Sequence, residues 1–458
     1  MTKFLSLLAL LFIPLYSFTF DIEGTWQGRI KLLVYSQDMR IVVHIGRDSV
    51  DHSLVASVEI PEQRLKDIDA DIELKDDSLY LTFPTFNAEY AAAYKKDSAC
   101  FVGSFKQGGF KLPMKLLKGE ADDLVYYRPQ KPKKPYPYLE EEVVIKNKKA
   151  GITLGGTFSK PKEGDKFPVI VFITGSGPEN RDETIFGHKP FLILGDYLTR
   201  RGFAVLRCDD RGVGKSTGDP SGTTADFAGD ISAMLDYLKT RKDVDTKRMG
   251  LLGHSEGGLI APLVNSKRKD VAFVVLLAAP AMDLYDLLLI QDSLASVADG
   301  QSAENIRLSM ERNKQVYAYV RNSKDSASAA DSIDYFLRTR HASDFEIAST
   351  LRFSDGKWMR WFIGYDPTVN LRKLKCPVLA LNGEKDVQVP AHQNIALIDK
   401  ALKESGNKNY KTQILPGLNH AFQHCRKCSV VEYASLDETF SPEALQIIGD
   451  WLATLNVE

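Results

Sequence analysis

The segment with the clearest chemical signal is 253–257, which has the sequence Gly-His-Ser-Glu-Gly and the form G-x-S-x-G. An apolar, strand-like run ends here, and a helical pattern rich in small residues begins. A serine in such a sharp turn needs glycines two positions away on either side, and the turn raises its Oγ above the sheet. The start of the helix also favours developing negative charge. We predict Ser255 as a nucleophile, and the competing interpretation is an ordinary serine in a glycine-rich turn.

A candidate acid lies in the stretch LALNGEKDVQVP, where Asp386 follows an apolar run and a glycine turn. A carboxylate in this place would orient an imidazole and stabilise its charged form without taking the proton itself. Glu384 is the nearby alternative, and a solvated turn aspartate is the non-catalytic interpretation. We predict Asp386 as the acid.

A candidate base lies in ILPGLNHAFQ, where His420 falls in the loop after the strand-like run YKTQIL. His392 and His424 compete for this role, but His392 is expected to open a helix and His424 lies one helical turn further on. With His420 as base, the chain order is Ser, Asp, His, which differs from the chymotrypsin and subtilisin orders. The predicted chemistry is acyl transfer through an acyl-enzyme, with His420 taking the serine proton.

Stabilising the oxyanion of such a reaction requires two backbone N–H groups near the serine. The first predicted donor is Glu256, the residue after the nucleophile. The second is expected in the loop 174–178, where glycines let the backbone approach a bound carbonyl, and we predict Ser176 or Gly177. A tight turn without a ligand is the alternative interpretation of this loop.

The elements that must position these residues alternate between strands and helices after a predicted hairpin over 140–161. Strands are predicted at 168–177, 203–210, 248–255 and 271–280, and helices at 191–202, 227–241 and 256–267. Short unbroken apolar strands that alternate with helices indicate a parallel sheet covered on both faces. We predict an α/β domain over 143–458, with a mostly parallel, doubly wound sheet.

The strand signal disappears between about 282 and 371, where helical segments predict an inserted cap. After the cap the alternation resumes, with a strand over 376–383, a helix over 391–405, a strand over 410–415 and a closing helix. Four aromatic side chains gather near the end of the cap, and they could line an acyl or aryl pocket or form the core of the cap: Trp358, Trp361, Phe362 and Tyr365. We favour the core.

The N-terminal part has a different pattern. Residues 21–127 carry β-rich runs and polar turns, which predict a small all-β barrel or sandwich. The proline-rich, basic stretch RPQKPKKPYPY predicts an extended linker over 128–142. Residues 1–20 have the layout of a cleavable export signal, with an uncleaved membrane anchor as the alternative. We therefore expect a periplasmic or extracellular protein.

Composition excludes some partners. The chain of 458 residues has a formal net charge of -1, so it offers no basic field for nucleic acid. Beyond the signal we find no apolar run of the roughly 18 to 20 residues that a membrane span needs. Cys208 and Cys376 are predicted as buried thiols, whereas Cys425 and Cys428 could close a local disulfide in an exported protein.

A metal site is the alternative that we weigh against this disulfide. His420, His424, Cys425 and Cys428 are zinc-ligand types at tolerable spacing. A metal there would remove the base that the serine needs, so we predict neither a metal nor an organic cofactor.

Taken together, the chain resembles the α/β-hydrolase superfamily, and within it bacterial secreted esterases and serine aminopeptidase-like hydrolases with an N-terminal β-rich domain. The matching segments are TGSGPENRDE, DDRGVGKSTG, GLLGHSEGG, LNGEKDVQVP and LPGLNHAFQ, with EGTWQGRI and SFKQGGFKLPMKL in the N-terminal part. The resemblance implies carboxylesterase or lipase-like activity on acyl esters and the triad named above, without identifying the natural substrate. We expect a small-molecule or glycan-linked acyl ester. A serine exopeptidase or amidase is the alternative, followed by a non-catalytic envelope binding protein, and a homodimer is left open.

Overall fold

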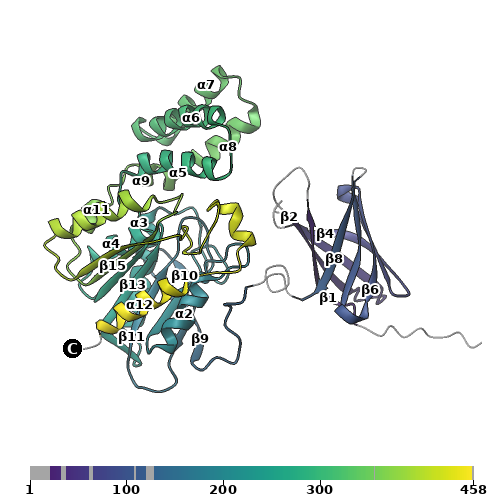
Figure 1. Ribbon diagram of the computed structural model, residues 1–458, viewed down its shortest axis with the longest axis horizontal. Helices are drawn as coiled ribbons and strands as arrows, with labels where there is room; N and C mark the ends of the chain where they lie inside the picture. The colour runs from purple at the N-terminus through teal and green to yellow at the C-terminus, as the bar shows by residue number, and fades with distance from the viewer. Residues whose placement is uncertain are drawn as a thin grey trace, which may run out of the picture. The chain divides into compact units, whose positions relative to one another are not determined.

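The computed structural model describes residues 21–31, 38–60, 65–107, 110–119, 128–354 and 356–455. The chain divides into two compact units, Met1–Tyr127 and Arg128–Glu458 (Figure 1). The predicted export signal lies outside the described residues. Within the described part of the chain, no helix combines the length and the apolar character needed to cross a membrane.

The first unit is a closed antiparallel barrel (Figure 1). Its strands follow one another around the barrel, and β1 closes it by pairing with β8. Inside, the rings of Trp26 and Phe101 meet edge to face with centroids 4.9 Å apart. The predicted all-β domain is confirmed as a barrel. The strands are β1 Gly24–Lys31, β2 Asp38–Arg47, β3 Leu54–Ile60, β4 Leu65–Lys75, β5 Ser78–Phe83, β6 Ala88–Lys95, β7 Cys100–Gln107 and β8 Phe110–Lys118.

The second unit is built on an eight-stranded sheet in the order β16-β15-β14-β13-β11-β12-β10-β9. The five strand pairs from β12 to β16 are parallel, whereas β9 and β10 form an antiparallel edge. The mostly parallel sheet agrees with the predicted alternation. The strands are β9 Leu139–Asn147, β10 Ile152–Lys160, β11 Phe167–Ile173, β12 Ala204–Cys208, β13 Val244–His254, β14 Phe273–Leu277, β15 Val378–Gly383 and β16 Tyr410–Leu415.

Helices cover both faces of this sheet. One apolar core joins the sheet to α3 Thr224–Leu238, α4 Gly257–Asn265 and α11 Ala391–Glu404. A second core joins the opposite face to α2 Pro190–Arg200 and α12 Pro442–Thr454. The central strands are buried on both sides, which explains their unbroken apolar sequences. The doubly wound α/β-hydrolase fold is thus confirmed.

A helical cap is inserted between β14 and β15, as predicted (Figure 1). Its own apolar core also includes Leu259 of α4, which ties the cap to the sheet layer. The last helix of the insertion packs against α4 and α11. The inserted helices are α5 Leu284–Ala298, α6 Ala303–Asn322, α7 Ser326–Thr339, α8 Asp344–Ser354, α9 Lys357–Ile363 and α10 Thr368–Leu371.

The proline-rich stretch predicted as a linker has neither helix nor strand before β9 begins at Leu139, so the predicted bounds of 128–142 include four residues that belong to the strand. It is nevertheless attached to the second unit. The amide of Gln130 donates to the carbonyl of Phe440 at 2.7 Å and accepts from the N–H of Thr439 at 2.6 Å. Composition predicts an extended linker, but the backbone over 129–138 consists of turns and bends packed on the second unit, because tertiary hydrogen bonds of this kind have no signature in the local sequence.

Candidate active site

Ser255 lies in the turn between β13 and α4, with a left-handed φ of 51°. Such a backbone costs a residue other than glycine roughly 1–2 kcal/mol. The flanking glycines are required by close packing, because a Cβ on Gly253 would lie 2.0 Å from the carbonyl oxygen of Gly257. A Cβ on Gly257 would lie 2.2 Å from the carbonyl oxygen of Ile173. The spacing of the motif therefore reflects the sharpness of this turn.

His420 and Asp386 lie together, as the sequence predicts. The Nδ1 atom of His420 is 2.8 Å from Oδ2 of Asp386, and the Asp386 side chain is fully buried. The other oxygen of Asp386 accepts the N–H groups of Gln388 and Val389 at 2.8 Å each, and Asn382 donates to Oδ2 at 3.1 Å. These hydrogen bonds fix the carboxylate, which in turn fixes the orientation of the imidazole.

The alternative acid and bases are placed elsewhere. The Glu384 carboxylate accepts the N–H of Gly417 at 3.0 Å in an exposed position. His424 faces Glu438 at 2.9 Å with a side chain that is 57% exposed. His392 is exposed near the start of α11. None of these three side chains lines the cavity described next.

Ser255 and His420 line one cavity of about 340 Å³. Among the described residues, no hydrogen bond joins the Ser255 hydroxyl to His420; catalytic hydrogen bonds of this kind often tighten only when substrate is bound. The wall of the cavity is mainly apolar and comes from the sheet loops and the cap, and it includes Ile185, Phe191, Leu277, Leu287, Leu288, Phe353, Val389, Phe422 and Phe440.

The predicted oxyanion donors separate into two groups. Ser176 and Glu256 line the cavity beside Ser255, and no hydrogen bond of the described residues engages their N–H groups. Gly177 lines a different, smaller cavity that does not include Ser255. The N–H of Gly175 is already donated to Glu183 at 2.8 Å. Of the two candidates for the second donor, Ser176 is thus the better placed.

The four cap aromatics also separate. Trp358 and Phe362 line the cavity and stack on each other, with ring centroids 4.6 Å apart. Trp361 and Tyr365 stack at 4.5 Å outside the cavity lining. The indole N–H of Trp358 donates to the Glu256 carboxylate at 2.8 Å, so the cap is bonded to the residue after the nucleophile. All four side chains pack into apolar cores: Trp358, Phe362 and Tyr365 into the core of the cap, and Trp361 against the core of the sheet. The favoured core interpretation therefore holds for three of them, and Trp358 and Phe362 line the cavity as well.

Sequence reasoning missed two residues next to the triad, Glu183 and His254. His254 contacts the Glu183 carboxylate through Nδ1 at 2.9 Å and the carbonyl oxygen of His420 through Nε2 at 3.0 Å. Burial by itself would lower the pKa of His254, but the Glu183 carboxylate raises it to about 9. His254 occupies a variable position of G-x-S-x-G, so the motif gives no signal for it.

The wall around residues 430–440 is held by segments that are distant in sequence. His188 contacts the hydroxyl of Thr439 at 2.6 Å and the carbonyl of Tyr433 at 2.9 Å. Arg128, in the predicted linker, donates to two carbonyls of this wall at 2.7 and 3.1 Å. Burial and the nearby Arg128 cation lower the pKa of His188 to about 4, so its imidazole is neutral.

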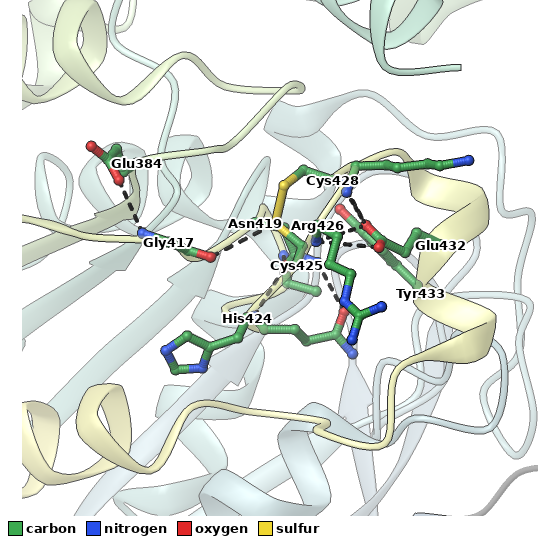
Figure 2. The surroundings of a disulfide bond; sticks show 12 residues. Glu384, Gly417, Asn419, His424, Cys425, Arg426, Cys428, Glu432 and Tyr433 are labelled. Atoms are coloured by element: carbon green, nitrogen blue, oxygen red, sulfur yellow. Dashed lines mark hydrogen bonds between the residues drawn. A yellow bond between two sulfur atoms is a disulfide. The ribbon is translucent and has the colours of Figure 1, made fainter. Parts of the chain in front are cut away.

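The loop after His420 contains a disulfide between Cys425 and Cys428 (Figure 2). The N–H of Cys425 donates to the carbonyl of Gly417 at 3.4 Å, and the Glu432 carboxylate accepts the N–H of Cys428 at 2.6 Å. Figure 2 shows these contacts on both sides of the sulfur pair. The disulfide interpretation, which the sequence left open, holds here, and the sulfurs are not available as zinc thiolates.

The segments that form this site match a known family. Residues 151–421 match the X-Pro dipeptidyl-peptidase (S15) family, and the match spans more than half of the chain. The chain belongs to the S15 family. Membership confirms the predicted α/β-hydrolase superfamily, and the family takes its name from a peptidase.

Individual relatives of this S15-family chain include esterases and peptidases. Esterase EstD of Thermotoga maritima is 27% identical over 293 residues, which cover 62% of this chain and 60% of the esterase. Human dipeptidyl peptidase 8 is 30% identical over 158 residues, or 32% of this chain and 17% of that protein. Among solved structures, a Pyrococcus furiosus esterase has a TM-score of 0.44 at 16% identity, covering 72% of this chain and 98% of that one. The chain thus spans about 60% of EstD and far less of the human peptidase.

Proposed function

We propose that this S15-family chain is a serine esterase that cleaves carboxylic esters with Ser255, His420 and Asp386. The observation that carries the proposal is the His420 imidazole, held at 2.8 Å by the buried Asp386 on the same apolar cavity as Ser255. The strained backbone of Ser255 supports it, because strain of this kind clusters at functional sites.

In the proposed reaction His420 accepts the Ser255 proton as the serine oxygen attacks the ester carbonyl. The N–H groups of Ser176 and Glu256 hold the resulting oxyanion, and each such donor typically contributes about 3 kcal/mol to the transition state. His420 then returns the proton to the departing alcohol. Water releases the acyl group in a second step by the same route in reverse.

The cavity supports a substrate with a small to medium acyl or aryl group. Its volume of about 340 Å³ lies near the lower end for ligand pockets, and its walls are mainly apolar. EstD, which resembles the chain over part of its length, is named an esterase.

The decisive experiment is labelling of the purified protein with a fluorophosphonate, alongside Ser255→Ala. We expect labelling of the native chain, none of the variant, and at least about a 1000-fold loss of p-nitrophenyl ester hydrolysis. Ser266→Ala, near the other end of α4, is the matched control and should label normally. A well-folded native chain that does not react with the probe would refute the proposal and favour a non-catalytic binding protein.

An exopeptidase is the second candidate, and one observation favours it. Three acidic residues, Glu179, Glu183 and Glu256, line the cavity that holds Ser255. Burial, Glu183 and Asp210 raise the pKa of Glu179 to about 7. Glu183 is already paired with His254, but a substrate ammonium group bound beside Glu179 would favour the ionised form of that carboxyl and pair with it. The ratio of kcat/KM for aminoacyl-nitroanilides and p-nitrophenyl esters separates the two functions, and Glu179→Gln should lower only the first if the exopeptidase is correct.

We also propose that the chain is exported, with residues 1–20 as its signal. The disulfide between Cys425 and Cys428 supports an oxidising compartment. Mass measurement of the mature protein from a secreting host tests this, and an intact N-terminus on a cytosolic product would contradict it.

A further inference from the structure

Glu183 and His254 contact the two parts of the site that must be held in register. We propose that they form a second acid–histidine pair, which positions the oxyanion loop and the catalytic histidine loop around Ser255. They are positioning residues, since neither is placed to transfer the proton of the serine. The catalytic role of the pair rests on the proposed function. The existence of the Glu183–His254 pair does not depend on that function.

The pair connects three segments. Oε1 of Glu183 accepts the N–H of Gly175 at 2.8 Å, and Gly175 precedes the proposed oxyanion donor Ser176. The same oxygen lies 2.9 Å from Nδ1 of His254, which precedes the nucleophile. Nε2 of His254 lies 3.0 Å from the carbonyl oxygen of His420. One chain of hydrogen bonds therefore runs from the oxyanion loop to the catalytic base.

The partners of His254 determine its protonation. A carboxylate lies at one ring nitrogen and a carbonyl oxygen at the other, and both can only accept hydrogen bonds. A neutral imidazole has one N–H and satisfies one of them, whereas an imidazolium satisfies both. The raised pKa of His254, about 9, agrees with this geometry.

Two further features indicate that the arrangement is built for position. Glu183 has a left-handed φ of 53°, although it is not glycine, and it is 8% exposed. The strained backbone of Glu183 therefore directs its carboxylate toward His254 and Gly175. The pair also lies directly between the oxyanion loop and the nucleophile, because a Cβ on Gly175 would be in van der Waals contact, at 3.4 Å, with both Oε1 of Glu183 and Cβ of Ser255.

The test is a double-mutant cycle with Glu183→Gln and His254→Gln. Glu183→Gln removes the charge that keeps the imidazolium, so the contact to His420 weakens. We expect each single variant to lower kcat for p-nitrophenyl acetate by about 10- to 100-fold, because small displacements of reacting groups have effects of this size. KM should change less than about 3-fold. The double variant should be no slower than the slower single variant, since the residues act as one unit.

The matched control is Glu141→Gln, which removes a carboxylate that contacts Arg241 on the antiparallel edge of the sheet. It should keep the native kcat. Additive losses in the cycle, or a native kcat in either single variant with folding preserved by circular dichroism, would overturn the positioning role.

A second measurement is independent of activity. In protein labelled with 15N-histidine, the His254 ring, assigned by its absence in His254→Gln, should show two protonated nitrogens at pH 7.5 and a neutral ring in Glu183→Gln. A neutral ring in the native chain would refute the pair itself. Failure of Ser255 to label would refute only the proposed function and, with it, the catalytic purpose of the pair.

Discussion

The neutral, buried His188 gives the chain a specific dependence of stability on acid. Its pKa falls from the usual 6.5 to about 4 in the folded state, because of burial and the nearby Arg128 cation. Above pH 6.5 neither the folded nor the unfolded chain protonates this side chain. Between pH 6.5 and 4 only the unfolded chain is protonated at His188. The free energy of unfolding therefore decreases as the pH is lowered through this range. At about 1.4 kcal/mol for each pKa unit, the contribution lost by pH 4 is roughly 3 kcal/mol.

Replacing His188 with Gln removes the pH-dependent part of the free energy of unfolding that comes from the imidazole. The glutamine amide can still donate to the carbonyl of Tyr433. We expect His188→Gln to be less stable than the native chain by about 1–3 kcal/mol at pH 7.5, since the Thr439 hydroxyl loses its partner. The deficit should shrink as the pH approaches 4. Urea unfolding followed by circular dichroism at 222 nm reports on the second unit, because all α-helices of the described residues belong to it.

The matched control is His392→Gln, which removes an exposed histidine from α11 in the same unit. It should follow the native curve at every pH. If His188→Gln and the native chain lose stability in parallel between pH 6.5 and 4, the buried imidazole is protonated in the fold and the reasoning is wrong.

Three further predictions concern the site. Trp358→Ala should shift the preference among p-nitrophenyl ester chain lengths, whereas Trp361→Ala should lower the melting temperature and leave that preference unchanged; the reverse pattern would exchange their assigned places. Reducing the Cys425–Cys428 disulfide should cost at most about 2 kcal/mol of urea stability, because its loop is short, and a count of five free thiols before reduction would exclude the bond. Gly257→Ala should lower expression and unfolding midpoint, since its Cβ would meet a carbonyl of β11 at 2.2 Å, and a native midpoint would contradict that packing.

The parts of the fold that were predictable from sequence are those with a local physical signature. The alternation of apolar strands with helices predicts the sheet, and the loss of strand signal predicts the cap between β14 and β15. The G-x-S-x-G motif around Ser255 is recognisable in the sequence because a Cβ on either Gly253 or Gly257 would clash with the backbone. Such constraints act over a few residues, so they are visible in a single sequence.

The parts that were not predictable depend on partners distant in sequence. His254 is 71 residues from Glu183 and 166 residues from His420. The local sequence around His254 therefore predicts neither contact. The choice between Ser176 and Gly177 similarly needed the direction of the loop. Polar side chains that serve distant partners look like ordinary polar side chains until the chain is folded.

The attachment of Arg128 has a practical consequence for dissecting the protein. The guanidinium donates to carbonyls at Phe186, Ala434 and Leu436, so the first residue of the second unit anchors the cavity wall. A truncated chain that starts at β9, where regular secondary structure begins, would discard this anchor along with the barrel. Loss of activity in such a fragment would then be mistaken for a role of the barrel. A truncation immediately before Arg128 keeps this anchor, so any change in activity can be assigned to the loss of the barrel.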